Sequence, residues 1–188
     1  ATAIGKTSAN GEVLVLDSAG YGPFTVAQSI SVIAPSGVYA GITVTSGTGI
    51  SINGSGIVVT LRGLSINGQG GQWGIQFLQG ARLTVESCEI SSMATHGIVV
   101  EAVDGRAVIQ DTILRDNYEA VLAYSTAGTL RVSIVDSKIL NNTYGVESFA
   151  YTGSSTVTVS RSTVTGHQEG LRVYAGAGYT ASILSDGN

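Results

Sequence analysis

The chain has 188 residues, of which 26 are glycine and only 12% are charged, and its formal net charge at pH 7 is −4. This length fits one domain with a continuous core. The nine Lys and Arg residues are scattered singly, which argues against nucleic acid as a partner, and no apolar run reaches the ~18–20 residues of a membrane span. Abundant Val, Ile, Thr and Ser with little Glu, Lys or Gln are typical of an all-β chain with many turns.

The strand pattern changes in regularity along the chain. Residues 1–11 are expected to hold the remnant of an N-terminal cap, including the end of a short helix in residues 1–7. Residues 12–60 alternate Val or Ile with polar residues, but their period is loose and their turns are rich in Gly. Residues 61–188 repeat regularly, and the last repeat, which starts near Ile183 and Leu184, is incomplete.

Three series of apolar residues recur at intervals of 23 to 25 residues in the regular part. Because each series lies in a short alternating stretch, the pattern predicts three short strands in each coil of about 23–26 residues. No segment from Thr7 onward has a helical pattern of ten or more residues, so an α/β sheet is excluded. We therefore expect one domain over residues 1–188, an all-β parallel solenoid whose like side chains stack in internal columns. The series are Ile66, Ile90, Leu114, Ile139 and Val164; Ile75, Ile98, Val121, Val146 and Leu171; and Leu61, Val85, Ile109, Ile134 and Val159.

Two further columns are predicted to be polar. A small column two residues before the first apolar series is expected to point inward, with its hydroxyl groups satisfying one another. Its members are Leu64, Cys88, Thr112, Ser137 and Ser162. Asn117 and Asn142 are 25 residues apart and should form a short amide ladder at a bend. Cys88 is the only cysteine, and the chain has no CxxC or His-rich pattern, so we expect no disulfide, no metal site and no cofactor.

The repeated units LTVESCEI, VSIVDSKILNNTYGV and TVTVSRSTVTGHQEGL resemble the right-handed parallel β-helix superfamily typified by pectate lyases and polygalacturonases. The resemblance covers about residues 12–188. The opening segment GEVLVLDSAGYGPFTVAQSISVIAP is similar to a bacterial group of right-handed β-helix repeat proteins of unassigned activity. The resemblance implies the right-handed coil, which also agrees with the rule for parallel crossovers, and a location outside the cell or in the cell envelope.

Two groups of residues are candidates for catalysis. Asp111, Asp136 and Arg161 form one column at a bend and look like a reduced form of a lyase's calcium-and-arginine arrangement, the only case in which Ca²⁺ would be required. Alternatively, this column is a solvated charge ladder. His96 is expected beside Glu119 and Glu101 and could form an acid/base pair, although one histidine and two glutamates on a strand are commonly solvated surface residues.

The strongest candidate for binding is an exposed aromatic strip formed by Tyr124, Phe149 and Tyr174, which recur at intervals of 25 and are flanked by Glu147 and Arg172. Strand alternation places these rings outside the core. The strip could stack on sugar rings or seat another protein, or turn segments could cover it as a satellite core.

The sequence predicts a non-catalytic scaffold or binding module that contacts polysaccharide through the aromatic strip. Two alternatives stay open. One is a polysaccharide lyase or glycoside hydrolase of the pectate lyase-like superfamily. The other is a structural or protein-interaction solenoid that associates with another protein or with itself through its open ends.

Overall fold

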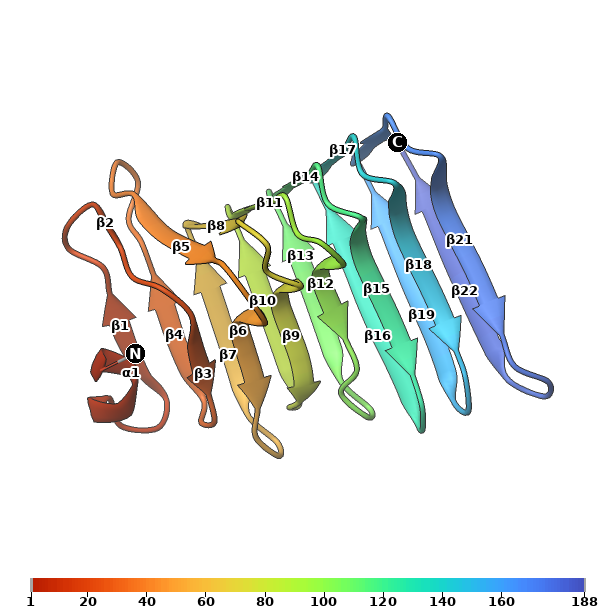
Figure 1. Ribbon diagram of the computed structural model, residues 1–188. Coiled ribbons are helices and arrows are strands. Elements are labelled where there is room, and N and C mark those ends of the chain that lie inside the picture. The colour runs from red at the N-terminus through yellow and green to blue at the C-terminus, as the bar shows by residue number, and fades with distance from the viewer. Residues whose placement is uncertain (1, 188) are drawn as a thin grey trace.

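The computed structural model of the chain describes residues 2–187. It is an all-β parallel solenoid of about seven turns, with three strands in each coil and about 25 residues per coil (Figure 1). This architecture confirms the fold class expected from the three apolar series. The short helix α1 (Thr2–Lys6) lies at the N-terminal end and buries Ile4.

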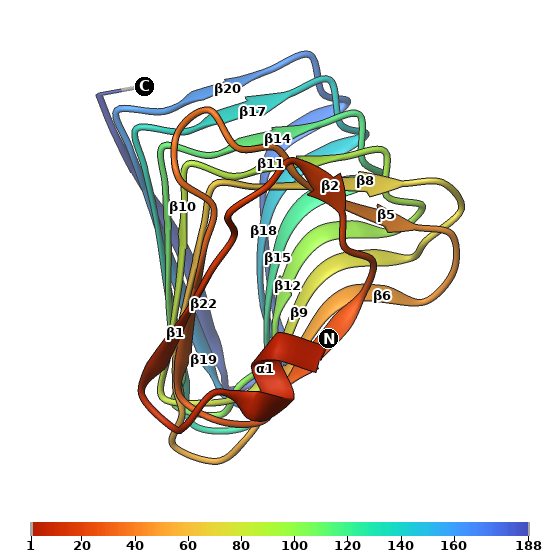
Figure 2. The ribbon, with the colours of Figure 1, turned by 90° about the vertical axis from the view of Figure 1, so that its left-hand side faces the viewer.

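Each coil contributes one strand to each of three parallel sheets, named A, B and C here, which surround the core when the solenoid is viewed from its N-terminal end (Figure 2). Sheet A contains β1 (Gly11–Leu14), β4 (Ile30–Ile33), β7 (Val58–Arg62), β10 (Arg82–Glu86), β13 (Arg106–Gln110), β16 (Thr129–Val135), β19 (Ser154–Ser160) and β22 (Thr180–Asp186). Sheet B contains β2 (Ala19–Gly20), β5 (Ala40–Val44), β8 (Leu64–Gly68), β11 (Glu89–Ser91), β14 (Ile113–Arg115), β17 (Lys138–Leu140) and β20 (Thr163–Thr165). Sheet C contains β3 (Phe24–Val26), β6 (Thr48–Asn53), β9 (Trp73–Gln79), β12 (His96–Val100), β15 (Glu119–Ser125), β18 (Tyr144–Ala150) and β21 (Glu169–Ala175).

The three predicted apolar series form three internal columns. In sheet B, for example, the strand register pairs Ile66 with Ile90, Ile90 with Leu114, and Leu114 with Ile139. These four side chains are fully buried. Burial falls off in the last coil, where Leu171 is 42% exposed, because each coil is covered by the next.

One residue in the left-handed region turns the chain from sheet A to sheet B in each regular coil. Its φ angle is 51° at Ser87, 48° at Asp111, 50° at Asp136 and 47° at Arg161. Asp tolerates this conformation better than most residues, because its short polar side chain can bond locally. The bend points these side chains out of the solenoid, so the Asp111, Asp136 and Arg161 column lies between sheets A and B.

The small polar column is buried as predicted, but its hydroxyl groups do not bond to one another. Instead, the Oγ atom of Ser137 accepts a hydrogen bond from the backbone N–H of Thr112 at 3.2 Å and donates to the carbonyl of Val135 at 2.8 Å. Thr112 and Ser162 repeat both bonds in the neighbouring coils. The prediction of mutual hydroxyl bonding was wrong because the bend leaves backbone groups at this column without ladder partners, and those groups use both functions of the hydroxyl.

The amide ladder is present, and a histidine extends it by one coil. The Oδ1 atom of Asn142 accepts from both the backbone N–H and the side chain of Asn117, each at 2.9 Å. The Asn142 amide donates to the carbonyls of Leu114 at 3.1 Å and Leu140 at 3.0 Å. In the next coil, Nδ1 of His167 lies 3.1 Å from the backbone nitrogen of Asn142. Each rung therefore satisfies buried backbone groups of the coil before it.

Truncation of a column residue should be costly. We expect Ile139→Ala to lower the free energy of unfolding by about 2–5 kcal/mol, because the cavity is closed above and below by Leu114 and Val164. Urea unfolding followed by circular dichroism measures the change. The matched control is Lys138→Ala, an exposed neighbour that should change stability by no more than about 0.5 kcal/mol. Equal effects of the two variants would contradict the column.

Removal of an amide rung should also destabilise the fold. We expect Asn142→Leu to cost about 1–3 kcal/mol for each buried backbone group that it leaves without a partner, beginning with the N–H of Asn117. His167→Asn keeps an acceptor at the next rung and should be tolerated. The same urea titration compares the two variants, and a stable Asn142→Leu protein would show that the ladder does not hold the bend.

Candidate functional site

The outer face of sheet C brings together most of the residues predicted to be functional. The strand register places His96 beside Trp73 and Glu119, and Glu119 beside Tyr144. A parallel row pairs Leu122 with Glu147 and Glu147 with Arg172, and a third pairs Tyr124 with Phe149 and Phe149 with Tyr174. The three rows run along the solenoid axis because equivalent residues of successive coils stack.

His96 and Glu119 form the predicted pair, but Glu119 is buried. The Nε1 atom of Trp73 donates to Nδ1 of His96 at 3.2 Å, so the remaining ring nitrogen, Nε2, carries the proton that faces Oε2 of Glu119 at 3.3 Å. Glu119 is only 5% exposed. The expectation that these side chains are solvated was therefore wrong for Glu119, because it lies between His96 and Tyr144 in its row and these neighbours shield it from solvent.

Glu147 approaches Glu119 from the neighbouring row. Burial raises the pKa of the Glu147 carboxyl above its ordinary value, and the negative charge and hydrogen bond of Glu119 raise it further, while Arg172 opposes the shift. Within residues 2–187, no group donates to the buried Oε1 atom of Glu119. The Glu147 carboxyl therefore keeps its proton more readily than an isolated glutamate does.

Arg172 contacts three of its neighbours on the face. Its guanidinium contacts Glu147 at 3.2 Å and Glu169 at 3.0 Å, and it lies 4.0 Å from the ring centre of Tyr144. The Tyr144 ring in turn packs edge to face against Tyr118, with ring centres 5.3 Å apart. A guanidinium held by two carboxylates and a ring face is poorly available to a further anion.

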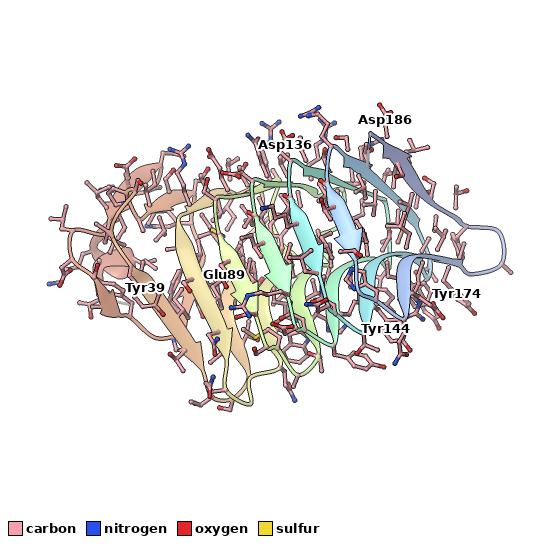
Figure 3. All side chains as sticks on the ribbon, turned by 90° about the horizontal axis from the view of Figure 1, so that it is seen from above. Tyr39, Glu89, Asp136, Tyr144, Tyr174 and Asp186 are labelled. Carbon is pink, nitrogen blue, oxygen red and sulfur yellow. The ribbon has the colours of Figure 1, made fainter. Side chains whose placement is uncertain are left out.

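The aromatic strip is a row of rings packed on one another. The ring centres of Tyr124 and Phe149 are 5.1 Å apart, and those of Phe149 and Tyr174 are 4.8 Å apart. Tyr151, from the turn after β18, packs edge to face against Phe149 at 6.4 Å. Tyr124 and Phe149 are half-buried, and Tyr174 is 61% exposed. The turn thus adds one ring to the strip, while the ring of Tyr174 stays exposed. Tyr144 and Tyr174 lie on the same side of the solenoid (Figure 3).

A shallow groove of about 310 Å³ lies beside the strip, near the lower end of the roughly 300–1,000 Å³ of ligand pockets. Val99 and Leu122 contribute apolar surface to it, and Glu101 contributes a carboxylate that accepts a hydrogen bond from Gln76 at 3.1 Å. The groove is lined by Trp73, Gln76, His96, Val99, Glu101, Leu122, Tyr124 and Phe149. Rings and polar groups therefore meet in one concave surface.

A second cavity, of about 250 Å³, lies at the N-terminal end of the solenoid. It is lined mainly by apolar core side chains such as Ile4, Val15 and Ile42. It is more enclosed than the groove on sheet C, but it lies away from the charged and aromatic rows. The groove is therefore the better candidate for a functional site.

The other predicted catalytic residues lie on a different edge of the solenoid, and Asp136 projects on the side opposite Tyr144 (Figure 3). Arg161 binds Asp136 through two hydrogen bonds of 2.8 Å, and Ser87 donates to Asp111 at 2.9 Å. The ion pair lowers the pKa of Asp136 and raises that of Arg161. An arginine must lose its own proton before it can act as a base, and the ion pair with Asp136 opposes that loss. In the described part of the chain, no three His, Cys, Asp or Glu side chains are grouped to hold a metal ion.

Sequence reasoning missed two features of the face. The first is the contact between Glu119 and Glu147, which belong to different rows. The second is the groove beside Glu101 and Gln76. Gln76 belongs to the row that continues through Val99, Leu122, Glu147 and Arg172, and the regular spacing of this row was the signal that could have revealed the groove.

Comparison with known proteins agrees with the fold. A family model described as the right handed beta helix region matches residues 28–183. No curated protein matches the chain. The crystal structure of pectate lyase Pel9A is similar over 88% of this chain and 58% of that enzyme, with 12% sequence identity and a TM-score of 0.49. The chain thus spans little more than half the length of that enzyme. Among the described residues, no helix is long and apolar enough to cross a membrane.

The raised pKa of Glu147 predicts a pH-dependent stability. The native protein binds this proton more tightly than the unfolded chain does, so the stabilisation is complete below the unfolded pKa and is lost as pH rises through the folded pKa. We expect Glu147→Gln to become progressively more stable than the parent protein as pH rises from about 4.5 towards neutrality. Urea unfolding at several pH values measures this difference.

The control for this pH series is Glu12→Gln, which changes an exposed glutamate of β1. Its stability difference from the parent protein should stay flat over the same range. A flat difference for Glu147→Gln as well would show that Glu147 does not hold a proton more tightly in the folded state.

Proposed function

This chain belongs to the right-handed β-helix family, and we propose that it is a non-catalytic binding module that holds a polysaccharide along the outer face of sheet C. The observation that carries the proposal is the aromatic strip of Tyr124, Phe149 and Tyr174, continuous with the groove at Tyr124 and Phe149. We also propose that the protein meets this ligand outside the cell or in the cell envelope.

The geometry of the solenoid suits a polymer better than a single small molecule. Successive coils present equivalent side chains about 4.8 Å apart, so a chain lying along the axis meets ring after ring. Aromatic rings offer apolar surface and a negative face to the C–H groups of sugars, and Tyr side chains also carry a hydroxyl. Polar neighbours such as Gln76, Glu101 and His96 can fix the orientation of sugar hydroxyls.

The surroundings of the acidic groups favour binding over hydrolysis. Glycosidases place two carboxyls on either side of the bond that they cleave. Glu119 is only 5% exposed, and neither Glu119 nor Glu147 is among the residues that line the groove, so these two carboxyls do not flank a sugar bound there. The lyase alternative depends on Arg161 as a base, and Arg161 is held by Asp136.

A protein-interaction role is a second candidate, supported by a separate observation. Three apolar side chains are well exposed in the last coil, namely Leu171, Val173 and Leu184. They lie on strands β21 and β22, which are the last strands of sheets C and A among the described residues. This surface is separate from the groove, so the two roles are compatible.

Removal of exposed rings should weaken glycan binding. We expect Tyr124→Ala and Tyr174→Ala each to reduce affinity at least about tenfold, equivalent to about 1.4 kcal/mol, for whichever glycan a glycan array identifies. Affinity electrophoresis or titration calorimetry measures the loss. Tyr39→Ala is the matched control, since Tyr39 is an exposed tyrosine at the end of the solenoid opposite Tyr174 (Figure 3) and its removal should leave affinity unchanged.

Two results would count against this function. Unchanged affinity in both ring variants would remove the strip from the binding surface. Formation of unsaturated product from polygalacturonate with Ca²⁺, followed by its absorbance and lost in Asp136→Asn, would favour the lyase alternative instead.

A further inference from the structure

The outer face of sheet C carries more acid than base. Within the described residues, its seven strands contain three glutamates, Glu119, Glu147 and Glu169, but only one arginine, Arg172, and one histidine, His96. Glu101 follows β12 directly and lines the groove. A ligand that settles on this face therefore meets a surface with an excess of carboxyl groups.

The positive groups of the face are already committed. Arg172 bridges Glu147 and Glu169 and covers the ring of Tyr144. His96 accepts from Trp73 and faces Glu119. An anionic sugar could gain a partner here only by breaking one of these contacts, which would leave a partly buried glutamate without its counter-charge.

Glu101, in contrast, has no positive partner. It accepts one hydrogen bond from Gln76, and no ion pair involves it within residues 2–187. The groove thus presents a carboxylate without a counter-charge in the same lining as the rings of Trp73 and Tyr124, and this arrangement favours the arrival of a positive charge.

We propose that the groove on sheet C takes a glycan that carries free, protonated amino groups, and that Glu101 is the residue that pairs with the amine. This inference rests on the binding function proposed above and specifies its ligand class. An ammonium group has three donors for the Glu101 carboxylate and nearby acceptors, while the negative faces of Trp73 and Tyr124 favour both sugar C–H groups and a neighbouring cation. A polyuronate would instead place its carboxylates beside Glu101 and Glu147.

The experiment compares four hexasaccharides by titration calorimetry at a pH at which the amine is protonated. Three share a β-1,4-linked glucose-type backbone and differ at one carbon, which bears an amine, an N-acetyl group or a hydroxyl. The fourth is hexagalacturonate. We expect the amine-bearing hexamer to bind at least about tenfold more tightly than its N-acetylated and hydroxyl counterparts, and hexagalacturonate to bind most weakly.

Glu101→Gln tests the assigned residue. This variant keeps the size of the side chain, and it should lower the affinity for the amine-bearing hexamer by a much larger factor than the affinity for the two neutral hexamers, so that most of the amine preference is lost. Glu12→Gln removes the same charge from an exposed site on sheet A and should keep the preference, which controls for the overall negative charge of the protein. Urea unfolding of each variant verifies that the fold is retained.

The outcomes separate this inference from the binding function. Preference for hexagalacturonate or a neutral hexamer, or full amine preference in Glu101→Gln, overturns the assignment and leaves a glycan-binding face. If none of the four hexasaccharides binds, but a glycan array identifies another ligand whose binding is lost in Tyr124→Ala, only the proposed ligand class is overturned. Failure of all probes and of the array overturns both proposals.

Discussion

The hydrogen bonding of each strand to the equivalent strand of the next coil is the constraint on which the rest of this structure depends. It fixes successive coils about 4.8 Å apart, so a residue in one coil lies directly over its counterpart 23 to 25 residues later. Apolar residues then form columns such as Ile90, Leu114 and Ile139 that no single coil could bury. The same constraint forces polar and charged residues into rows, where like groups become neighbours.

Inside the solenoid, this enforced stacking is resolved through the backbone. Ser137 and its counterparts use their hydroxyls to bond backbone groups at the bend, and Asn142 spans two coils with its amide. The polar columns therefore connect successive coils. They fix how one coil is placed on the next through the geometry of their hydrogen bonds as well as through burial. Strands that end at a bend need such connectors, because the regular ladder stops there.

Outside the solenoid, the same stacking creates the features that suggest function. The stacking brings the carboxyl groups of Glu119 and Glu147 close together, and their mutual repulsion must be offset by a proton or by a positively charged neighbour. His96 contacts Glu119, and Arg172 contacts Glu147. Rings brought together at Tyr124, Phe149 and Tyr174 pack on one another and leave open surface at one end. The row of rings and the groove that contains Glu101 are the two features on which the proposed binding of a glycan rests.

The sequence by itself determined the period, and with it the three strands per coil, the apolar columns and the membership of each outer row. Those follow from spacing alone, because equal spacing means stacking once the strands are parallel. The sequence could not determine which side chains of neighbouring rows contact each other. The closeness of Glu119 and Glu147, the tilt of the rings and the groove beside Glu101 were therefore visible only in the tertiary structure. Such contacts depend on side-chain rotamers and on the local twist between rows. The hydrogen-bond partners of Ser137 were also visible only in the structure, because the repeat does not reveal which backbone groups lack a ladder partner at a bend.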